Sequence, residues 1–267
     1  MLGFDNIDAL NSRFFLIAGP CIVEDEKTSY TIAEELKKIC DNYDVPLVFK
    51  ASYKKANRTR LDSFTGIGDK TALEIIHNIG KALSIPTITD IHESKDADLA
   101  AQYVDALQIP AFLSRQTDLL TAAAKTNKII NIKKAQFASP ESMSHAIEKV
   151  RANGNDKIWI TERGSSFGYS NLIVDFTGFP IMKSFGCPLV LDCTHSLQLP
   201  NKSSGITGGK PEFIETLAKA GIAAGADGIF METHPDPSIS KSDGANMIPL
   251  DKVGDLIEKL VKLKKAL

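Results

Sequence analysis

The sequence has few cysteines and lacks the segments that would export or anchor a protein. Its four cysteines form no CxxC pair, and a chain of 267 residues in a reducing compartment needs no disulfides. We read them as free thiols or ligands. No apolar run approaches the length of about 18 residues that spans a bilayer, and residues 1–8 lack the basic region and apolar run of a signal peptide. We therefore expect a cytoplasmic protein with no membrane contact.

Basic runs and nucleotide-binding motifs are also missing. The 31 Lys and Arg residues are balanced by 33 Asp and Glu residues, for a formal net charge of -2. Without a long basic run to follow a nucleic acid backbone, nucleic acid is not an expected partner. The sequence contains no G-x-G-x-x-G element, no P-loop and no G-x-S-x-G element. Dinucleotide binding, nucleotide triphosphate hydrolysis and serine hydrolase activity therefore lose their usual support.

What the chain does contain is a regular alternation of short apolar runs and longer segments with helical periodicity, which is typical of a parallel sheet covered by helices. The expected strands are 14–18, 47–51, 87–91, 106–109, 129–132, 157–161, 189–192 and 228–232. The expected helices are 26–42, 69–83, 95–102, 116–126, 140–152, 176–185, 211–224 and 250–265. No linker divides the chain. We predict an α/β fold in which residues 1–267 form a single (β/α)8 TIM barrel, with a doubly wound open sheet as the alternative.

Polar side chains crowd just after the ends of the expected strands, which in a barrel all open on one face. A slightly acidic chain that gathers many cations at one mouth must offset their mutual repulsion, and bound phosphates are the simplest way to do so. Arginine forks and lysine charges are both suited to phosphate oxygens. We expect Lys50, Lys133 and Arg163 to be partly buried, because each lies at or just past an apolar strand. The alternative is that these cations only solvate loops.

A second group of side chains also follows the ends of strands. Cys21, His195, Glu232 and Asp243 come after the first, seventh and eighth strands, which are adjacent in a closed barrel. One thiolate, one imidazole and two carboxylates suit a divalent transition metal, such as Zn, Fe or Mn, better than Mg or Ca. Taken one at a time, a cysteine in such a place is usually a small buried apolar residue, and a histidine usually fills a hydrogen-bonding niche.

Eight stretches of the sequence carry a resemblance to a known family. They are AGPCIVE (18–24), FKASYKKANRT (49–59), TDIHE (89–93), QIPAFLSRQTDL (108–119), NIKKAQF (131–137), TERGSSFGY (161–169), DCTHSLQ (192–198) and ETHPDP (232–237). Together they closely resemble the 3-deoxy-D-manno-octulosonate 8-phosphate synthase family, also called 2-dehydro-3-deoxyphosphooctonate aldolase, over nearly the whole chain. Members of this family are (β/α)8 barrels, commonly homotetramers, that condense phosphoenolpyruvate with D-arabinose 5-phosphate and release phosphate in lipopolysaccharide biosynthesis.

The resemblance implies a role for each matching residue. Those implied to hold phosphoenolpyruvate are Lys50, Lys55, Lys133, Gln136 and Arg163, with Lys133 and Arg163 on its phosphate. Asn57 and Arg58 are implied to meet the arabinose 5-phosphate, and Arg115 is implied to reach the sugar phosphate from a neighbouring subunit. We add Asp90 and Gln108, at the ends of the third and fourth strands, to the substrate-binding residues. The catalytic candidates are His195, Lys55, Asp243 and Asn57.

The family contains metal-dependent members, which have a cysteine after the first strand, and metal-independent members, which have asparagine there. Cys21 places this chain with the metal-dependent group, and Ser242 and Asp243 agree with that class. Because metal-free relatives perform the same reaction, the ion is expected to orient substrate and water rather than to supply indispensable Lewis acidity. A water on the metal, His195 and Asp243 are all eligible to protonate the aldehyde.

Other activities remain open from the sequence. The nearest is 3-deoxy-D-arabino-heptulosonate 7-phosphate synthase, which uses erythrose 4-phosphate. That enzyme typically shows Lys-Pro-Arg-Thr-Ser where this chain reads Lys-Ala-Asn-Arg-Thr, so we take Asn57 as the discriminating residue. A Schiff-base aldolase would use Lys50 or Lys133 as its nucleophile. A metal-dependent aldolase for ketose phosphates and a non-catalytic phosphosugar sensor are further alternatives.

Overall fold

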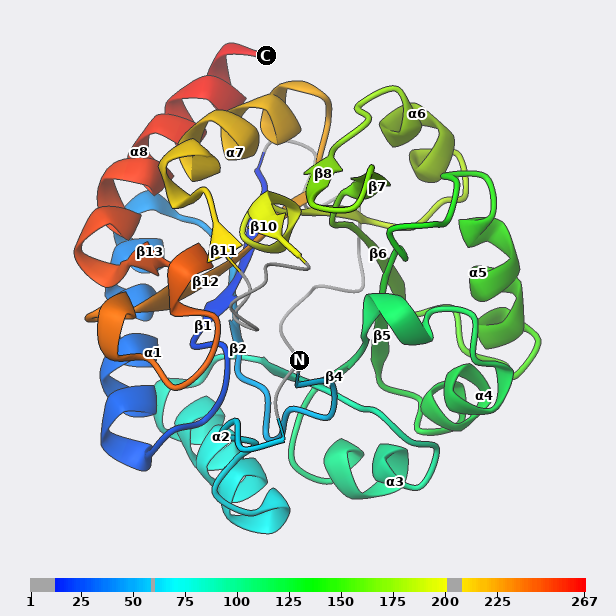
Figure 1. The fold of residues 1–267 in the computed structure, drawn as a ribbon, viewed down its shortest axis with the longest axis horizontal. Helices are drawn as coiled ribbons and strands as arrows, with labels where there is room; N and C mark the ends of the chain where they lie inside the picture. The colour runs from blue at the N-terminus through cyan, green and yellow to red at the C-terminus, as the bar shows by residue number, and fades with distance from the viewer. Residues whose placement is uncertain (1–12, 59–60, 201–207) are drawn as a thin grey trace.

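Eight parallel strands form a closed ring with helices around the outside in the computed structural model, which describes residues 13–58, 61–200 and 208–267 (Figure 1). Neighbouring strands pair in the order β1-β2-β3-β4-β5-β6-β9-β12, and β12 pairs with β1 to close the ring. The prediction of a (β/α)8 barrel is confirmed, and the open-sheet alternative is wrong. The barrel strands are β1 (Phe15–Gly19), β2 (Leu47–Lys50), β3 (Thr87–Asp90), β4 (Ala106–Ile109), β5 (Ile129–Lys133), β6 (Ile158–Glu162), β9 (Leu189–Asp192) and β12 (Gly228–His234).

A helix follows each barrel strand along the chain. The helices are α1 (Glu26–Tyr43), α2 (Asp69–Leu83), α3 (Asp96–Ala101), α4 (Thr117–Lys125), α5 (Met143–Arg151), α6 (Gly178–Lys183), α7 (Ile214–Ala223) and α8 (Leu250–Ala266). Two of the expected helices begin three residues later than predicted. Helix α5 begins three residues after Pro140, and a 3-10 turn (Pro211–Phe213) precedes α7. In both cases the proline opens a turn ahead of the helix.

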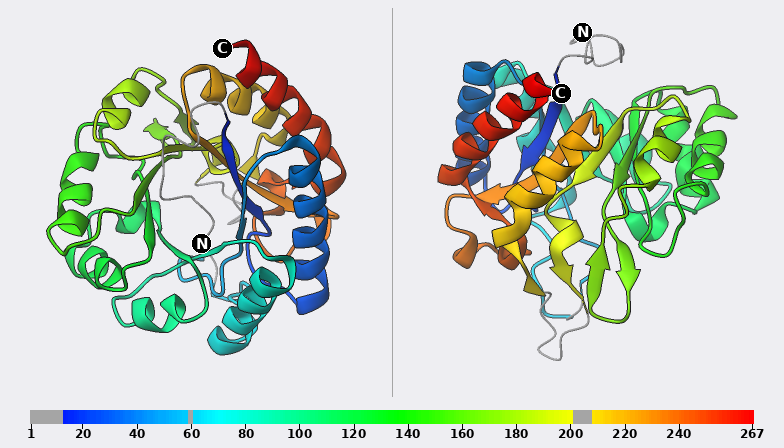
Figure 2. Two further views of the ribbon diagram at one scale, coloured as in Figure 1. Left: turned by 180° about the vertical axis from the view of Figure 1, so that it is seen from behind. Right: turned by 90° about the horizontal axis from the view of Figure 1, so that it is seen from above.

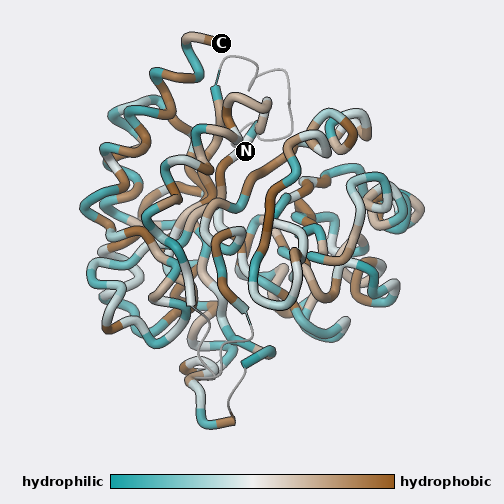
Figure 3. Tube along the Cα trace, turned by 45° about the horizontal axis from the view of Figure 1, so that its top comes forward, coloured by the Kyte–Doolittle hydropathy of each residue, from teal (hydrophilic) through white to brown (hydrophobic). Residues whose placement is uncertain are grey.

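The strand sequences explain why both faces of the sheet are covered. Along β1, Phe15 and Ile17 point into the barrel, whereas Leu16 and Ala18 pack against the helices, and all four are fully buried. Inside the barrel, the ring of Phe15 packs against that of Trp159, with 5.0 Å between the two ring centroids. Figure 3 shows the resulting pattern, with hydrophobic residues along the strands and alternation of hydrophobic and hydrophilic residues along the helices.

One close approach between strands requires glycine. A Cβ on Gly19, at the end of β1, would lie 2.0 Å from the carbonyl oxygen of Lys50 on β2. Glycine therefore lets β1 and β2 approach each other closely at the point where β1 ends and the loop that carries Cys21 begins. This contact sets the position of Lys50 relative to Cys21.

Several short strands lie outside the ring and were not predicted. They are β7 (Ser165–Phe167) paired with β8 (Asn171–Ile173), β10 (Gln198–Leu199) paired with β11 (Gly208–Gly209), and β13 (Ile248–Pro249), which pairs in parallel with the end of β12. Figure 2 shows in its right-hand view that the β7–β8 hairpin extends from one end of the barrel, while the C-terminus lies at the other end. None of the helices in the described part of the chain has the length and apolar content that crossing a membrane requires.

Candidate active site

A cavity of about 1050 Å³ opens at the carboxyl ends of the barrel strands. This is the end at which barrel enzymes bind their substrates, and the volume lies at the upper limit of ordinary ligand pockets. The predicted site residues that line it are Lys50, Lys55, Asn57, Arg58, Asp90, Gln108, Lys133, Gln136, Arg163, His195, Glu232 and Asp243. Cys21 is fully buried, with its thiol 3.6 Å from the Asp243 carboxylate at the edge of this cavity.

Arg115 lies elsewhere. It is exposed, on the loop before α4, and borders a separate surface pocket of about 560 Å³ together with Phe137 and Lys149. The structure therefore does not bring Arg115 to the cavity of its own chain. A role at the cavity would require Arg115 to act from another subunit.

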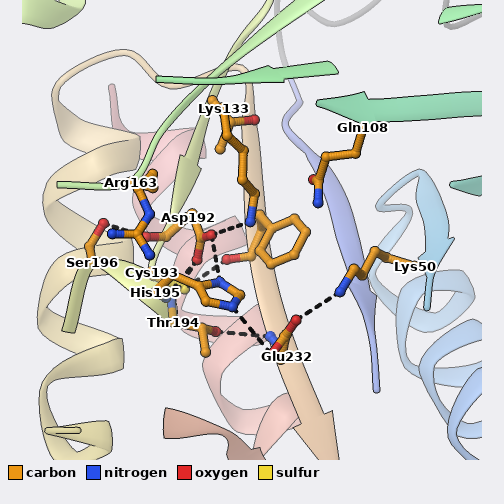
Figure 4. Close-up of polar contacts among 12 residues, drawn as sticks. Lys50, Gln108, Lys133, Arg163, Asp192, Cys193, Thr194, His195, Ser196 and Glu232 are labelled. Carbon is orange, nitrogen blue, oxygen red and sulfur yellow. Dashed lines mark hydrogen bonds and ion pairs between the residues drawn. The ribbon is translucent and has the colours of Figure 1, made fainter. Parts of the chain in front are cut away.

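A buried ion pair joins β2 to β12 at the base of the cavity (Figure 4). The ammonium of Lys50 lies 2.8 Å from Oε1 of Glu232 and donates to the carbonyl oxygen of Cys21 at 3.1 Å. Both side chains are almost completely excluded from solvent. Burial would raise the pKa of Glu232, but the charges of Lys50 and His195 outweigh it and lower that pKa to about 2. Glu232 is therefore a carboxylate at neutral pH.

A second buried carboxylate, Asp192 at the end of β9, holds two of the predicted residues at once (Figure 4). Its Oδ2 lies 2.6 Å from the ammonium of Lys133 and 2.7 Å from Nδ1 of His195. Its Oδ1 accepts the backbone N–H groups of Thr194 and His195 at 3.0 and 2.8 Å. Because Nδ1 of His195 faces a carboxylate, it carries a proton, and Nε2 faces Glu232 Oε2 at 3.5 Å. Burial lowers the pKa of Lys133, and Asp192 opposes that effect.

The ring of Phe230 lies close to the ammonium groups of both Lys133 and Lys50. The Lys133 ammonium lies 3.7 Å from the ring centroid of Phe230, within the range of a cation–π contact. The Lys50 ammonium lies 5.6 Å from the same centroid. Asp192 and Phe230 were not among the predicted site residues. Asp192 had a signal in the sequence, since it ends a strand three residues before His195, whereas nothing in the sequence singles out one phenylalanine of 13.

Three of the predicted cations at the cavity have no carboxylate within 4.0 Å among the described residues. Lys55 donates to Ser52 Oγ at 3.0 Å, and Arg58 donates to Ser242 Oγ at 2.7 Å. Arg163 donates from Nη2 to Gln198 Oε1 at 2.8 Å, while its Nη1 is buried without a hydrogen-bond partner. Burial lowers the pKa of Arg163. A buried guanidinium with an unpaired donor facing a cavity is suited to an anionic ligand.

A chain of hydrogen bonds crosses the mouth beneath these cations. Asp90 accepts from Ser52 Oγ and from the amide of Gln108, and Gln108 Oε1 in turn accepts from Asn131 at 3.0 Å. Burial would raise the pKa of Asp90, but the charges of Lys50 and Lys55 keep it below its ordinary range. Asp90 and Gln108 are therefore fixed in place at the cavity wall.

The predicted metal ligands are only partly brought together. Ligand atoms of Cys21, Glu232 and Asp243 lie within 4.8 Å of one another, whereas His195 is outside this group and faces Glu232 at 3.5 Å. The donor set fits a transition metal, because it combines sulfur with carboxylate oxygen and Oε2 of Glu232 is buried without a hydrogen-bond partner. Burial raises the pKa of the Cys21 thiol to about 12 in the metal-free site. A metal would therefore have to displace the thiol proton.

Two charged residues, at or just after the ends of β5 and β6, face away from the cavity. Lys134 and Glu162 are both buried, with Lys134 Nζ 3.5 Å from Glu162 Oε2, and neither lines the cavity. Successive residues of a strand point to opposite faces. Since Lys133 and Arg163 point into the mouth, their neighbours Lys134 and Glu162 point outward.

Comparison with known proteins places the chain among enzymes of one kind. Residues 5–267 match the family model described as the DAHP synthetase I family. Relatives named 2-dehydro-3-deoxyphosphooctonate aldolase include those of Trichlorobacter lovleyi (50% identical over 248 residues, 93% of this chain and 91% of the relative) and Desulfotalea psychrophila (49% over 264 residues, 99% and 94%). A relative from Geobacter metallireducens with the same name is 48% identical over 260 residues, which cover 97% of this chain and 96% of that protein.

Proposed function

The chain belongs to the DAHP synthetase I family, and from this premise we infer that it catalyses the reaction for which its 2-dehydro-3-deoxyphosphooctonate aldolase relatives are named. It condenses phosphoenolpyruvate with D-arabinose 5-phosphate and water, and it releases inorganic phosphate and 3-deoxy-D-manno-octulosonate 8-phosphate. The product belongs to lipopolysaccharide biosynthesis. We take residues 1–267 as one catalytic domain of a cytoplasmic homotetramer.

The observation that carries this proposal is the set of cavity cations without a carboxylate partner. Two substrates that each carry a phosphate require more positive charge than the chain's own carboxylates neutralise. Lys55, Arg58 and Arg163 supply that charge. The free Nη1 of Arg163 supports its assignment to the phosphate of phosphoenolpyruvate, next to Lys133.

The remaining assignments divide the cavity between the two substrates. Lys50, Lys55 and Gln136 hold the rest of phosphoenolpyruvate, whereas Asn57 and Arg58 meet arabinose 5-phosphate. Asp90 and Gln108, which are hydrogen-bonded to each other, form part of the cavity wall. Arg115 of another subunit contacts the sugar phosphate, which agrees with its exposed position away from the cavity of its own chain.

In the reaction, C3 of phosphoenolpyruvate attacks the aldehyde carbon of the sugar, and water adds to C2. The resulting hemiketal phosphate expels inorganic phosphate by cleavage of its C–O bond. During attack, C2 becomes electron-poor and the aldehyde oxygen becomes electron-rich. Fixed charges that line the cavity, such as Lys55 and the carboxylate of Glu232, stabilise this redistribution without reorganising. His195 and Asp243 are our candidates within this chain for the donor of the proton that the aldehyde oxygen requires.

A divalent transition metal such as Zn, Fe or Mn would be held by Cys21, Glu232 and Asp243, with His195 completing the set, and it would orient the substrate and water. His195 needs only a small movement to join, because its Nε2 already faces Glu232. The hydrogen bond from Nδ1 to Asp192 would then keep the other nitrogen free for the metal.

One assay tests the proposal. Purified protein is mixed with phosphoenolpyruvate and either arabinose 5-phosphate or erythrose 4-phosphate, and phosphate release is followed with and without a chelator. We expect release with arabinose 5-phosphate and little with erythrose 4-phosphate, and a loss of activity with chelator. Release with erythrose 4-phosphate alone would support the heptulosonate synthase alternative. Borohydride trapping should give no covalent adduct, and an adduct on Lys50 or Lys133 would support a Schiff-base aldolase.

A further inference from the structure

The buried pair of Lys134 and Glu162 lies directly behind the phosphoenolpyruvate end of the cavity. Lys134 continues the β5 ladder, since its backbone N–H donates to Thr161 O at 2.8 Å, so its side chain points away from the mouth. The side chain is fully buried, and so is that of Glu162 at the end of β6. Neither residue has a role in the reaction proposed above, although burying two charges is costly unless they are well paired.

The hydrogen bonds of Lys134 join two separate segments. Its ammonium donates to the carbonyl oxygens of Ala135 and Ala138, at 3.4 and 3.2 Å, in the connection between β5 and α5. It also donates to Ser165 Oγ at 3.0 Å, in the segment after β6. Lys134 therefore ties the loop that follows β5 to the strand β7.

Glu162 fixes the second of these segments. Its Oε1 accepts the backbone N–H of Gly164 at 2.6 Å, and its Oε2 faces the Lys134 ammonium at 3.5 Å. Gly164 has a φ of +88°, and a Cβ there would lie 3.1 Å from Cβ of Leu172, so the turn after Arg163 is tight. The carboxylate of Glu162 therefore holds the backbone on the far side of Arg163.

Each segment carries one cavity residue with an unpaired polar atom. Gln136 lies between Ala135 and Ala138, and its Oε1 is buried without a partner, as is Nη1 of Arg163. A further bond, from the N–H of Ser166 to the carbonyl oxygen of Gln136 at 2.9 Å, joins the same two segments. The separation of these two ligand-facing side chains thus depends on contacts that never reach the cavity.

We propose that Lys134 and Glu162 form a positioning pair that sets the spacing between Gln136 and Arg163, and so the fit of the cavity to phosphoenolpyruvate. Neither side chain touches substrate. This inference rests on the proposed function for the identity of the ligand. Packing alone does not require the pair, because a buried ion pair of this kind can often be replaced by apolar residues of similar volume without loss of stability.

The test is the double variant Lys134→Met/Glu162→Gln, which removes both charges together and leaves no buried charge unpaired. The introduced amide oxygen would still be able to accept the Gly164 N–H. Misplacement of binding groups by about 1 Å can cost up to about 100-fold, so kcat/KM for phosphoenolpyruvate should fall roughly 10- to 100-fold, while the KM for arabinose 5-phosphate should change less than about two-fold. The matched control is Lys183→Met, which removes a lysine paired with Asp227 at 2.7 Å, away from the cavity. The control should retain wild-type kinetics.

Several outcomes would overturn the inference. A folded double variant with an unchanged kcat/KM for phosphoenolpyruvate would do so, and so would a rise in KM that is equal for both substrates. If the double variant does not fold, Ser165→Ala decides the matter, because it removes a single bond from Lys134. A selective rise of about two- to five-fold in the KM for phosphoenolpyruvate would support the inference, given the 10- to 100-fold range for the whole pair, and no rise would refute it. Failure of the wild-type protein to release phosphate from the two substrates would instead refute the proposed function.

Discussion

A substitution of Arg163 would distinguish an effect on catalysis from an effect on folding stability. Arg163 is 6% exposed, and its Nη1 has no hydrogen-bond partner among the residues that the structure describes. The bond from its Nη2 to Gln198 is to a neutral amide. We therefore expect Arg163→Met to weaken catalysis strongly while leaving the fold intact or more stable.

The magnitudes follow from these contacts. A hydrogen bond to a charged group contributes about 1.5 to 3 kcal/mol, and loss of one preorganised donor in other enzymes costs about 2.7 to 4 kcal/mol. We expect kcat/KM to fall roughly 10- to 700-fold, since about 1.4 kcal/mol corresponds to a factor of ten. Burying an ion costs several kcal/mol, so its removal should raise the free energy of unfolding by about 1 kcal/mol, or Tm by about 2 to 4 °C.

The assay pairs steady-state phosphate release with thermal unfolding of the ligand-free protein. Lys133→Met is the comparison, because Lys133 is paired with Asp192 at 2.6 Å and its loss leaves that buried carboxylate with less compensation. Lys133→Met should lower both activity and Tm, whereas Arg163→Met should lower activity alone. If Arg163→Met lowers Tm by several degrees and retains near-normal kcat/KM, Arg163 is a structural residue and the reasoning fails.

Three further predictions concern acid stability, the metal and the assembly. Burial would raise the pKa of Asp90, but the charges of Lys50 and Lys55 outweigh burial and hold that pKa below the ordinary 3.8. The Asp90 carboxylate therefore adds folding stability that is lost as pH falls below about 4. Urea unfolding from pH 7 to 3 should show a smaller loss of stability in Asp90→Asn than in the wild type. Because the Cys21 thiol is protonated when metal-free, with a pKa of about 12, Zn²⁺ binding should release about one proton at pH 7. Calorimetry in two buffers should show this release in wild type and in the control Cys40→Ser, but not in Cys21→Ser. If Arg115 acts across a subunit boundary, mixing the variants Arg115→Ala and Lys133→Met should restore some activity after subunit exchange; no recovery in hybrids that form would contradict this role.

Much of the barrel could be predicted from the sequence because its strands are buried on both faces. Runs such as residues 47–50 and 189–192 are apolar at nearly every position, and each precedes a segment of helical periodicity. The β7–β8 hairpin gave no such signal. Its strands have three residues each and leave Phe167 and Ile173 exposed, so neither length nor hydrophobic pattern distinguishes them from a loop.

The position of the site could also be predicted, but its charge balance could not. All parallel strands end at one face, and Lys50 and Lys133, which lie at strand ends, line the cavity there. From the sequence alone, both lysines count as charges that a ligand must offset. In the structure they are offset by Glu232 and Asp192, which lie 182 and 59 residues away along the chain. Such pairing depends on which strands become neighbours and on side-chain rotamers, and neither is encoded in local spacing.

The cations that remain unpaired are arranged in a way that bears on the chemistry. Arg58 follows β2, and its guanidinium donates to Ser242 and to the carbonyl oxygen of Lys241 in the loop after β12. Arg163 follows β6, and its guanidinium donates to Gln198 after β9. The two arginines are therefore held by different loops of the mouth. Two phosphates repel each other, and binding each to its own arginine lets fixed positive charge offset that repulsion while the uncharged reacting carbons approach each other. The same cavity is lined by His195 and by the Lys50–Glu232 pair. This arrangement suits the joining of two singly phosphorylated molecules better than the binding of one, because a single phosphate would leave the other arginine without an anionic ligand.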